Sequence, residues 1–240
     1  MNALYHSILL QIKLDLRNRH ILTSYYLLPI AFYLIIGAIY KEITPGYEST
    51  MLTSMSILAI SLASYLGTPA PIVDFFNSNA KKTYQIGNIK LSIVLLTTFF
   101  SAVAHMCIVS SVIYMSIEGI FGVVPTSDIG THFAWLILCM VISTTIGIII
   151  GLVSKSTSVM TMISQLAFLP TMLLSGILLP LSFLPKILQE IGKILPATYA
   201  VKIMNTSSNP ESQLVLTFLM LGILSICILL TVYKRQLISE

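Results

Sequence analysis

The stretch Leu174–Tyr199, LSGILLPLSFLPKILQEIGKILPATY, follows a long apolar run, but its prolines break it too often for an ordinary membrane span. Pro180, Pro185 and Pro196 each remove a backbone donor and disfavour helix in the preceding residue. From the residue before the second of these prolines to the residue before the third, apolar residues recur at helical spacing. They are Leu184, Ile187, Leu188, Ile191, Ile194 and Leu195. The stretch therefore predicts that a span ends, the chain bends, a short helix follows, and the chain bends again.

The predicted short helix is amphipathic, because polar residues occupy the face opposite the apolar ones. These polar residues are Lys186, Gln189, Glu190 and Lys193. The spacings of Lys186 to Glu190 and of Glu190 to Lys193 allow charge pairs of roughly 0.2–0.5 kcal/mol each. Two interpretations remain open for this segment: a plain interfacial loop, or a re-entrant element half buried in apolar surroundings.

The composition predicts an all-α integral membrane protein. Of the 240 residues, 56% are hydrophobic and 9% are charged, and the mean hydropathy is +0.92. Soluble domains carry about 25% charged residues, so this chain has too much apolar surface for an aqueous fold. Cys107, Cys139 and Cys227 lie scattered in apolar runs and predict neither a disulfide framework nor a metal site. The basic residues form no dense patch with aromatics, which argues against a nucleic-acid partner.

Six apolar runs are long enough to be transmembrane helices. We expect these spans at about 21–40, 51–73, 91–117, 132–153, 158–179 and 214–233. The connecting segments that carry predictions are an interfacial helix at 1–20, a polar loop at 74–90, a re-entrant segment at 180–213 and a tail at 234–240. A cleaved signal peptide does not fit the start of the chain, because the first apolar run is too long and no small-residue cleavage site follows it.

The distribution of positive charge predicts the orientation. Six spans place both termini on one side, and nine of the 13 Lys and Arg residues lie on that side. Basic residues accumulate in cytoplasmic segments, so both termini, the 74–90 loop and the tail are predicted to be cytoplasmic in a bacterial-type plasma membrane. The segment 180–213 is then extracellular. None of the predicted spans contains Asp, Glu, Lys or Arg, which argues against a proton- or ion-coupled pump.

Some residues inside the spans stand out for packing or for polar contacts. Ser143, Gly147 and Gly151 recur at four-residue steps in the fourth span, and such small residues allow close helix packing. His105 in the third span and Gln165 in the fifth are the candidates for lining a transport pathway. Each could instead form a hydrogen bond with a neighbouring helix.

The order of these parts resembles the permease subunits of type-2 ABC exporters. The most specific residues are Leu174-Ser175-Gly176, Pro180, Pro185 and the run Pro196-Ala197-Thr198-Tyr199-Ala200. In that family, the corresponding segment forms re-entrant helices on the outer face between the last two spans. The resemblance therefore implies an extracellular gate. Its residues here would be Ser175, Gly176, Pro180, Pro185, Ile187, Ile191 and Pro196.

The resemblance also implies that the 74–90 loop couples to an ATPase, together with the N-terminal helix. Family members often carry an acidic residue and a Thr-Pro element here. In this chain Asp74 and the pair Lys81-Lys82 are the equivalents, whereas the proline is missing. The expected ATPase-coupling residues are therefore Asp74, Lys81, Lys82 and Tyr84. The lysine pair could alternatively bind anionic lipid headgroups or simply enforce the topology.

No G-x-x-x-x-G-K-[ST] phosphate loop occurs, so the chain is not expected to be an enzyme or to bind a cofactor. By resemblance, ATP and Mg²⁺ belong to a separate nucleotide-binding subunit present in two copies. A second copy of this permease, or a homologous one, would complete the pathway. The expected cargo is an amphipathic peptide, an antimicrobial peptide, a drug or a lipid. The alternatives are a membrane assembly factor that is not coupled to ATP, and an intramembrane protease that would use Ser175 with His105.

Overall fold

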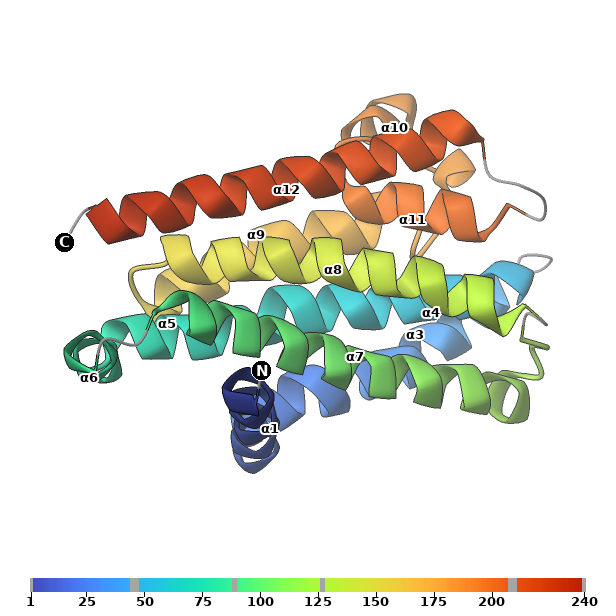
Figure 1. The fold of residues 1–240 in the computed structure, drawn as a ribbon. Coiled ribbons are helices and arrows are strands. Elements are labelled where there is room, and N and C mark those ends of the chain that lie inside the picture. The colour runs from blue at the N-terminus through green and yellow to red at the C-terminus, as the bar shows by residue number, and fades with distance from the viewer. Residues whose placement is uncertain (1, 44–47, 88–89, 126–127, 207–210, 239–240) are drawn as a thin grey trace.

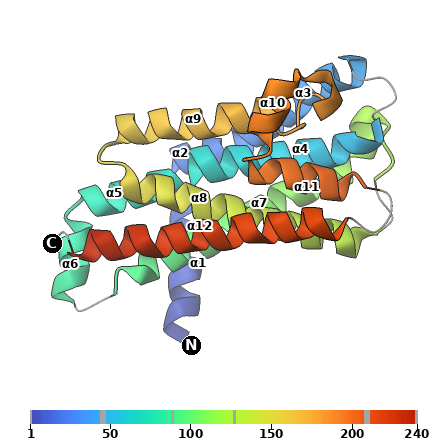
Figure 2. The same cartoon turned by 90° about the horizontal axis from the view of Figure 1, so that it is seen from above.

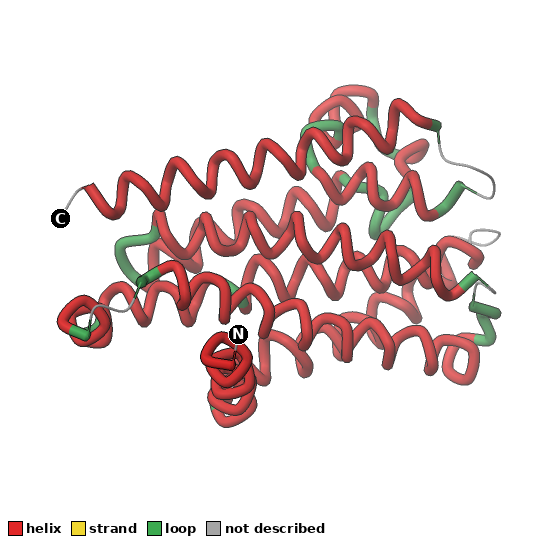
Figure 3. The backbone as a smooth tube through the Cα atoms, viewed as in Figure 1, coloured by secondary structure: helices red, strands yellow, loops and turns green. Residues whose placement is uncertain are grey.

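The computed structural model describes residues 2–43, 48–87, 90–125, 128–206 and 211–238, and within these ranges it contains helices and no strand. The predicted all-α fold is confirmed (Figures 1 and 3). Parts of four predicted segments lie outside the described residues. These parts are residue 1 of the interfacial helix, 88–89 of the polar loop, 207–210 of the re-entrant segment and 239–240 of the tail.

Six of the helices are long and apolar enough to cross a membrane, as predicted, and they run side by side as one bundle (Figures 1 and 2). Their bounds are Arg19–Ile43, Thr50–Asn77, Ser92–Phe121, Ile129–Val153, Thr157–Leu174 and Ser212–Lys234. We refer to them as spans 1 to 6. Spans 3, 4 and 5 are the helices α7, α8 and α9, and span 6 belongs to α12 (Ser212–Ile238).

Each of the first two spans contains one π-helical turn. Span 1 consists of α2 (Arg19–Leu22), the π-turn η1 (Thr23–Leu27) and α3 (Leu28–Ile43). Span 2 lies within α4 (Glu48–Leu62), the π-turn η2 (Ala63–Gly67) and α5 (Pro69–Asn77). Span 2 was predicted to end at 73 but continues to Asn77. Pro69 does not end it, because this proline takes the first position of α5, where a missing N–H costs nothing.

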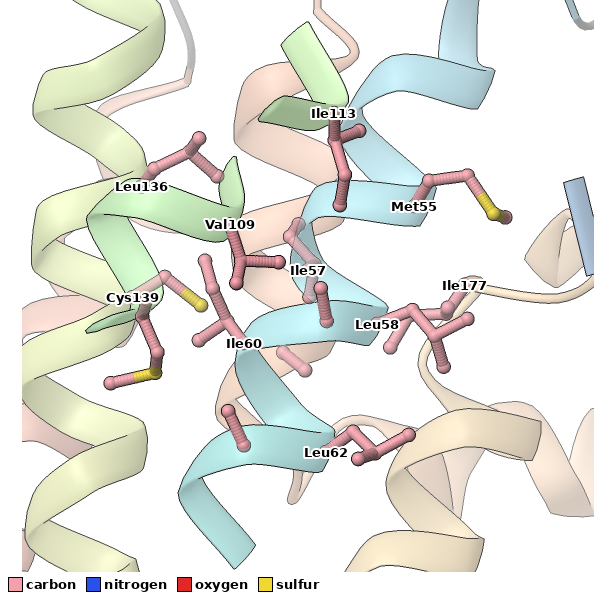
Figure 4. Packing of buried hydrophobic residues seen from close by; sticks show 14 of the residues in the cluster. Met55, Ile57, Leu58, Ile60, Leu62, Val109, Ile113, Leu136, Cys139 and Ile177 are labelled. Carbon is pink, nitrogen blue, oxygen red and sulfur yellow. The ribbon is translucent and has the colours of Figure 1, made fainter. Parts of the chain in front are cut away.

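Span 2 forms the centre of the bundle. Its side chains Met55, Ile57 and Leu62 are fully buried. Figure 4 shows α4 surrounded by apolar side chains from neighbouring elements, among them Val109 of α7 and Leu136 of α8. The largest buried cluster of the protein is thus organised around this helix.

The two ends of the bundle carry different short helices (Figures 1 and 2). One end, here called the α6 end, carries α6 (Ala80–Ile86) and the C-terminal part of α12. The other, the α10 end, carries α10 (Lys186–Gly192) and the start of α12. Helix α1 (Asn2–Arg17) lies crosswise to the spans against α7, as an interfacial helix would.

Two further boundaries differ from the sequence-based prediction. Span 5 ends at Leu174 and not at 179, because Gly176 has φ +83° and residues 175–179 bend away from the helix. The 74–90 segment is largely helical and not an open loop. Asp74 lies inside α5, and α6 follows after a short turn.

Candidate functional site

The α6 end carries the residues predicted to couple to an ATPase. Asp74 on α5 and Lys82 on α6 are exposed to solvent. Tyr84 is half-buried, because its ring packs edge-on against Phe75 of α5 with the ring centroids 5.0 Å apart. The structure thus brings the predicted residues together on two helices that contact one another through aromatic rings.

A second contact fixes the same corner. The Lys81 ammonium lies 5.6 Å from the ring centroid of Phe76, a cation–π geometry. The Asn77 side chain donates a hydrogen bond of 3.3 Å to the carbonyl of Lys155, in the turn between α8 and α9. Helix α6 is therefore held on α5, and α5 is held on the neighbouring turn between α8 and α9.

The small residues of span 4 lie against span 2. A Cβ atom at Gly147 would be 2.2 Å from the carbonyl oxygen of Ser64, and one at Gly151 would be 2.9 Å from the Cβ of Ile72. Ser143 is buried one turn earlier on the same helix. These positions let α8 approach η2 and α5 more closely than any larger side chain would allow.

At the α10 end, residues 175–204, here called the α10 segment, form the bends and short helices that the prolines predict. Ser175 and Ile177 are fully buried, and Pro185 precedes the first turn of α10. Ile187 and Ile191 project outward, with 76% and 44% of their surfaces exposed. The apolar face of this amphipathic helix is therefore only partly covered by the chain itself.

Backbone contacts hold the α10 segment in place. A Cβ at Gly192 would lie 2.4 Å from the carbonyl oxygen of Leu174, so α10 touches the end of span 5 directly. The Thr198 hydroxyl donates a hydrogen bond of 2.5 Å to the carbonyl of Gly192. Helix α11 (Pro196–Met204) then packs into the bundle against α4, α8 and α12 without crossing it. This short buried helix has the form expected of a re-entrant element.

The structure forms the Glu190–Lys193 charge pair that the sequence allows at the end of α10. The Lys193 ammonium lies 2.5 Å from the Glu190 carboxylate, and both side chains are more than half exposed. An exposed pair of this kind contributes little to stability.

The environment of His105 is closed and polar. Its Nδ1 atom lies 2.6 Å from the hydroxyl of Tyr26, and its Nε2 atom lies 3.6 Å from a carboxylate oxygen of Asp15. The same oxygen accepts a hydrogen bond from Ser101. Ser101 therefore donates to the carboxylate and not to the imidazole. Among the described residues, no three His, Cys, Asp or Glu side chains converge as a metal site requires.

The sequence analysis did not single out Asp15. It is the one acidic residue of α1, at 5% exposure, and its partners lie 86 and 90 positions further along the chain. The available signal was an acidic residue within an otherwise basic interfacial helix, four positions after Gln11, which donates to Asp15 at 2.8 Å. We call the set Gln11, Asp15, Tyr26, Ser101 and His105 the α1 junction.

Gln165 lies on the outside of the single chain. It is exposed on α9, and Thr161 is exposed one turn earlier. Span 5 contacts span 1 through the rings of Phe32 and Phe168, whose centroids are 6.5 Å apart. A polar amide facing hydrocarbon without a hydrogen-bond partner is unfavourable, so this face suits a pathway or another protein better than lipid.

Span 1 carries an open groove of about 700 Å³. Its lining residues are Arg19, Leu22, Thr23, Tyr26, Leu27, Ile30, Ala31 and Leu34. All but three of these side chains are aliphatic, and the charged one, Arg19, lies at the N-terminal end of the span. The groove therefore suits a molecule that is mainly apolar.

These features define an all-helical membrane protein with six candidate spans, a crosswise N-terminal helix and a short buried helix before the last span. A family model for the ABC-2 type transporter matches residues 4–207. The chain belongs to this family, and it is a transmembrane permease component of an ABC transporter, which works with an ATPase partner. No curated protein matches the chain.

Proposed function

We propose that this chain is the membrane-spanning subunit of an ATP-driven exporter and forms half of its substrate pathway. The observation that carries the proposal is the α5–α6 corner, where exposed polar side chains are presented on helices fastened to the centre of the bundle. Two copies of a separate ATPase subunit would bind ATP and Mg²⁺. The α6 end, both termini and the ATPase would face the cytoplasm of a bacterial-type cell.

The α5–α6 corner is suited to transmitting a displacement from the ATPase to the bundle. Helix α6 is attached to α5 by the Phe75–Tyr84 ring contact, and α5 continues through η2 into α4, the central helix. Because Gly147 packs against the backbone of η2, span 4 would move with span 2. A displacement of α6 would therefore reach the core of the bundle and would not be absorbed by a flexible loop.

A second permease, either an identical copy or a homologue, would cover the exposed side of span 5, where Thr161 and Gln165 lie among apolar side chains. Span 6 shows the contrast, since the exposed side chains in its middle are aliphatic apart from Met220 and Cys227, as expected for contact with lipid. Span 5 instead exposes Thr161 and Gln165. The pathway would then run between two copies, past the span 1 groove, and would take amphipathic peptides, drugs or lipids. The α10 segment would close it on the outer side.

The docking role can be tested with a charge-matched pair of variants. Lys82→Glu reverses a charge at the α6 end, and Lys186→Glu reverses one at the α10 end. The permease is purified through a tag, and the co-purified ATPase and its hydrolysis rate are measured. We expect Lys82→Glu to lower both several-fold and Lys186→Glu to leave both unchanged.

Equal behaviour of the two variants would show that the α6 end does not dock the ATPase. Purification of the wild-type chain without any nucleotide-hydrolysing partner would instead support the alternative of a membrane assembly factor.

A further inference from the structure

A continuous set of buried polar side chains joins α1 to span 3. The Asp15 carboxylate accepts hydrogen bonds from Ser101 of α7 at 2.5 Å and from Gln11 of its own helix at 2.8 Å. His105, at 1% exposure, lies beside the same carboxylate. A buried carboxylate is costly unless charged or hydrogen-bonded groups surround it, and here such groups come from both helices.

The set continues into span 1. The Tyr26 hydroxyl in η1 lies 2.6 Å from Nδ1 of His105, and the ring of Tyr25 stacks against the imidazole at 5.2 Å. The Tyr25 hydroxyl is hydrogen-bonded to Thr68, which follows η2, at 2.9 Å. When Tyr26 donates to Nδ1, the remaining imidazole proton is on Nε2, the atom that faces Asp15. The α1 junction thus reaches the π-turn of span 1, and Tyr25 extends it to the end of the π-turn of span 2.

Apolar burial against the protein does not explain the attachment of α1. Several large apolar side chains of this helix point away from the bundle, among them Tyr5 at 61%, Leu10 at 59% and Leu14 at 52% exposure. Ile8 and Ile12 are half-buried, and Asp15 is the buried residue among positions 5–17. The contact between α1 and α7 therefore includes a buried polar side chain, Asp15, beside partly buried apolar ones.

Tyr26 also lines the groove on span 1. We propose that Asp15 is a positioning residue: its carboxylate, hydrogen-bonded to Ser101, holds α1 on span 3 beside His105. Through the contact of His105 with Tyr26, it ties the position of α1 to the wall of the span 1 groove. The transport consequence rests on the proposed function, in which α1 lies beside the ATPase. The link between α1 and span 3 does not depend on that function.

The link is tested on the permease alone, in lipid nanodiscs, by hydrogen exchange of the α1 amides. Asp15→Asn keeps the size of the side chain and an acceptor for Ser101, and it removes the charge. We expect exchange in α1 to become about tenfold faster, while exchange in α6 stays unchanged. Lys13→Gln removes an exposed charge from the same helix and should leave α1 protected. If α1 in Asp15→Asn is as protected as in the wild type, the Asp15 carboxylate does not hold α1 on span 3.

Tyr26→Phe provides an independent variant, since it removes one hydroxyl and no charge. It should loosen α1 less than Asp15→Asn does, because Asp15 retains Ser101 and Gln11. The proposal is overturned if the α1 amides exchange equally slowly in the wild type, in Asp15→Asn and in Tyr26→Phe.

The positioning role is tested on the permease purified with its ATPase. Asp15→Asn should lower permease-dependent ATP hydrolysis several-fold at equal subunit ratio, whereas Glu211→Gln, the same carboxylate-to-amide change on an exposed residue before α12, should not. Faster exchange in α1 with unchanged hydrolysis would confine Asp15 to anchoring the helix and refute its role in coupling. Failure of the wild-type complex to hydrolyse ATP would refute the proposed function while leaving the exchange result standing.

Discussion

The α1 junction and the α10 segment both hold helices outside the six spans against the bundle, but by different interactions. At the α1 junction the contacts are made by ionisable and polar side chains, with Asp15 and His105 at its centre. In the α10 segment the contacts are made by backbone, by Gly192 and by the Thr198 hydroxyl. The junction should therefore be sensitive to loss of charge, and the α10 segment should be sensitive to added volume.

The largest effect is expected for Asp15→Ala. The change removes the acceptor of one buried and one partly buried hydrogen bond, so the free energy of unfolding should fall by about 3 kcal/mol. Unfolding in mixed micelles measures it. Glu211→Gln serves as the control and should change stability by less than about 0.5 kcal/mol. A loss for Asp15→Ala as small as that of the control would show that the junction is not stabilised by its carboxylate.

The next effect is expected for Gly192→Ala. Because the new Cβ would lie 2.4 Å from the carbonyl oxygen of Leu174, α10 must move away from span 5, at a cost of about 1–3 kcal/mol. Gly119→Ala is the matched control, since a Cβ there meets nothing within 4 Å. The thermal midpoints of the two purified variants provide the comparison. If both substitutions are equally tolerated, the close contact between α10 and span 5 does not exist.

A smaller effect is expected for Thr198→Val, which keeps the shape of the side chain and removes the hydroxyl. The carbonyl of Gly192 would lose this donor, and stability should fall by about 1 kcal/mol. The same thermal measurement applies. A variant as stable as the wild type would mean that steric fit alone holds the α10 segment.

The smallest effect concerns Asp128, the N-cap of α8 at the α10 end. Hydrogen bonds from the side chain and the backbone N–H of Thr131 lower the pKa of this carboxyl from 3.8. A lowered pKa stabilises the fold above the unfolded-state value, and this contribution is lost as the pH falls through the folded-state value. The midpoint difference between wild type and Asp128→Asn should therefore be constant from pH 5 to 8 and shrink below about pH 4. A difference that changes near pH 7 would contradict this assignment.

The sequence predicted the α10 segment better than the α1 junction, and the reason is physical. Prolines and helical periodicity act locally, so Pro185 and the isoleucines that follow it were enough to place α10. Helix α11 was not predicted, since only a bend was expected at Pro196. The junction depends on tertiary contacts between Asp15 and residues about 90 positions away. A carboxylate in an interfacial helix is ordinarily solvated, and no local pattern distinguishes the buried one.

The six spans were also predicted only as far as a local sequence signal marks them. Apolar length predicted all six, but the predicted end of span 5 was five residues too late, because an apolar run continues through Gly176 although its backbone does not stay helical. The π-turns of spans 1 and 2 had no signal in the sequence. Of the pathway candidates, His105 is enclosed by Tyr26 and Asp15, whereas Gln165 is exposed where a second permease could cover it.

The central claim, that this chain is the membrane half of an ATP-driven exporter, is tested most directly by transport in inside-out membrane vesicles. A fluorescent amphipathic peptide, a labelled lipid and a hydrophobic drug are each supplied from outside with ATP. We predict ATP-dependent accumulation of at least one of them when the permease and its ATPase are both present, and loss of accumulation in the Lys82→Glu variant. Accumulation that is unchanged without ATP, or without this chain, would contradict the account.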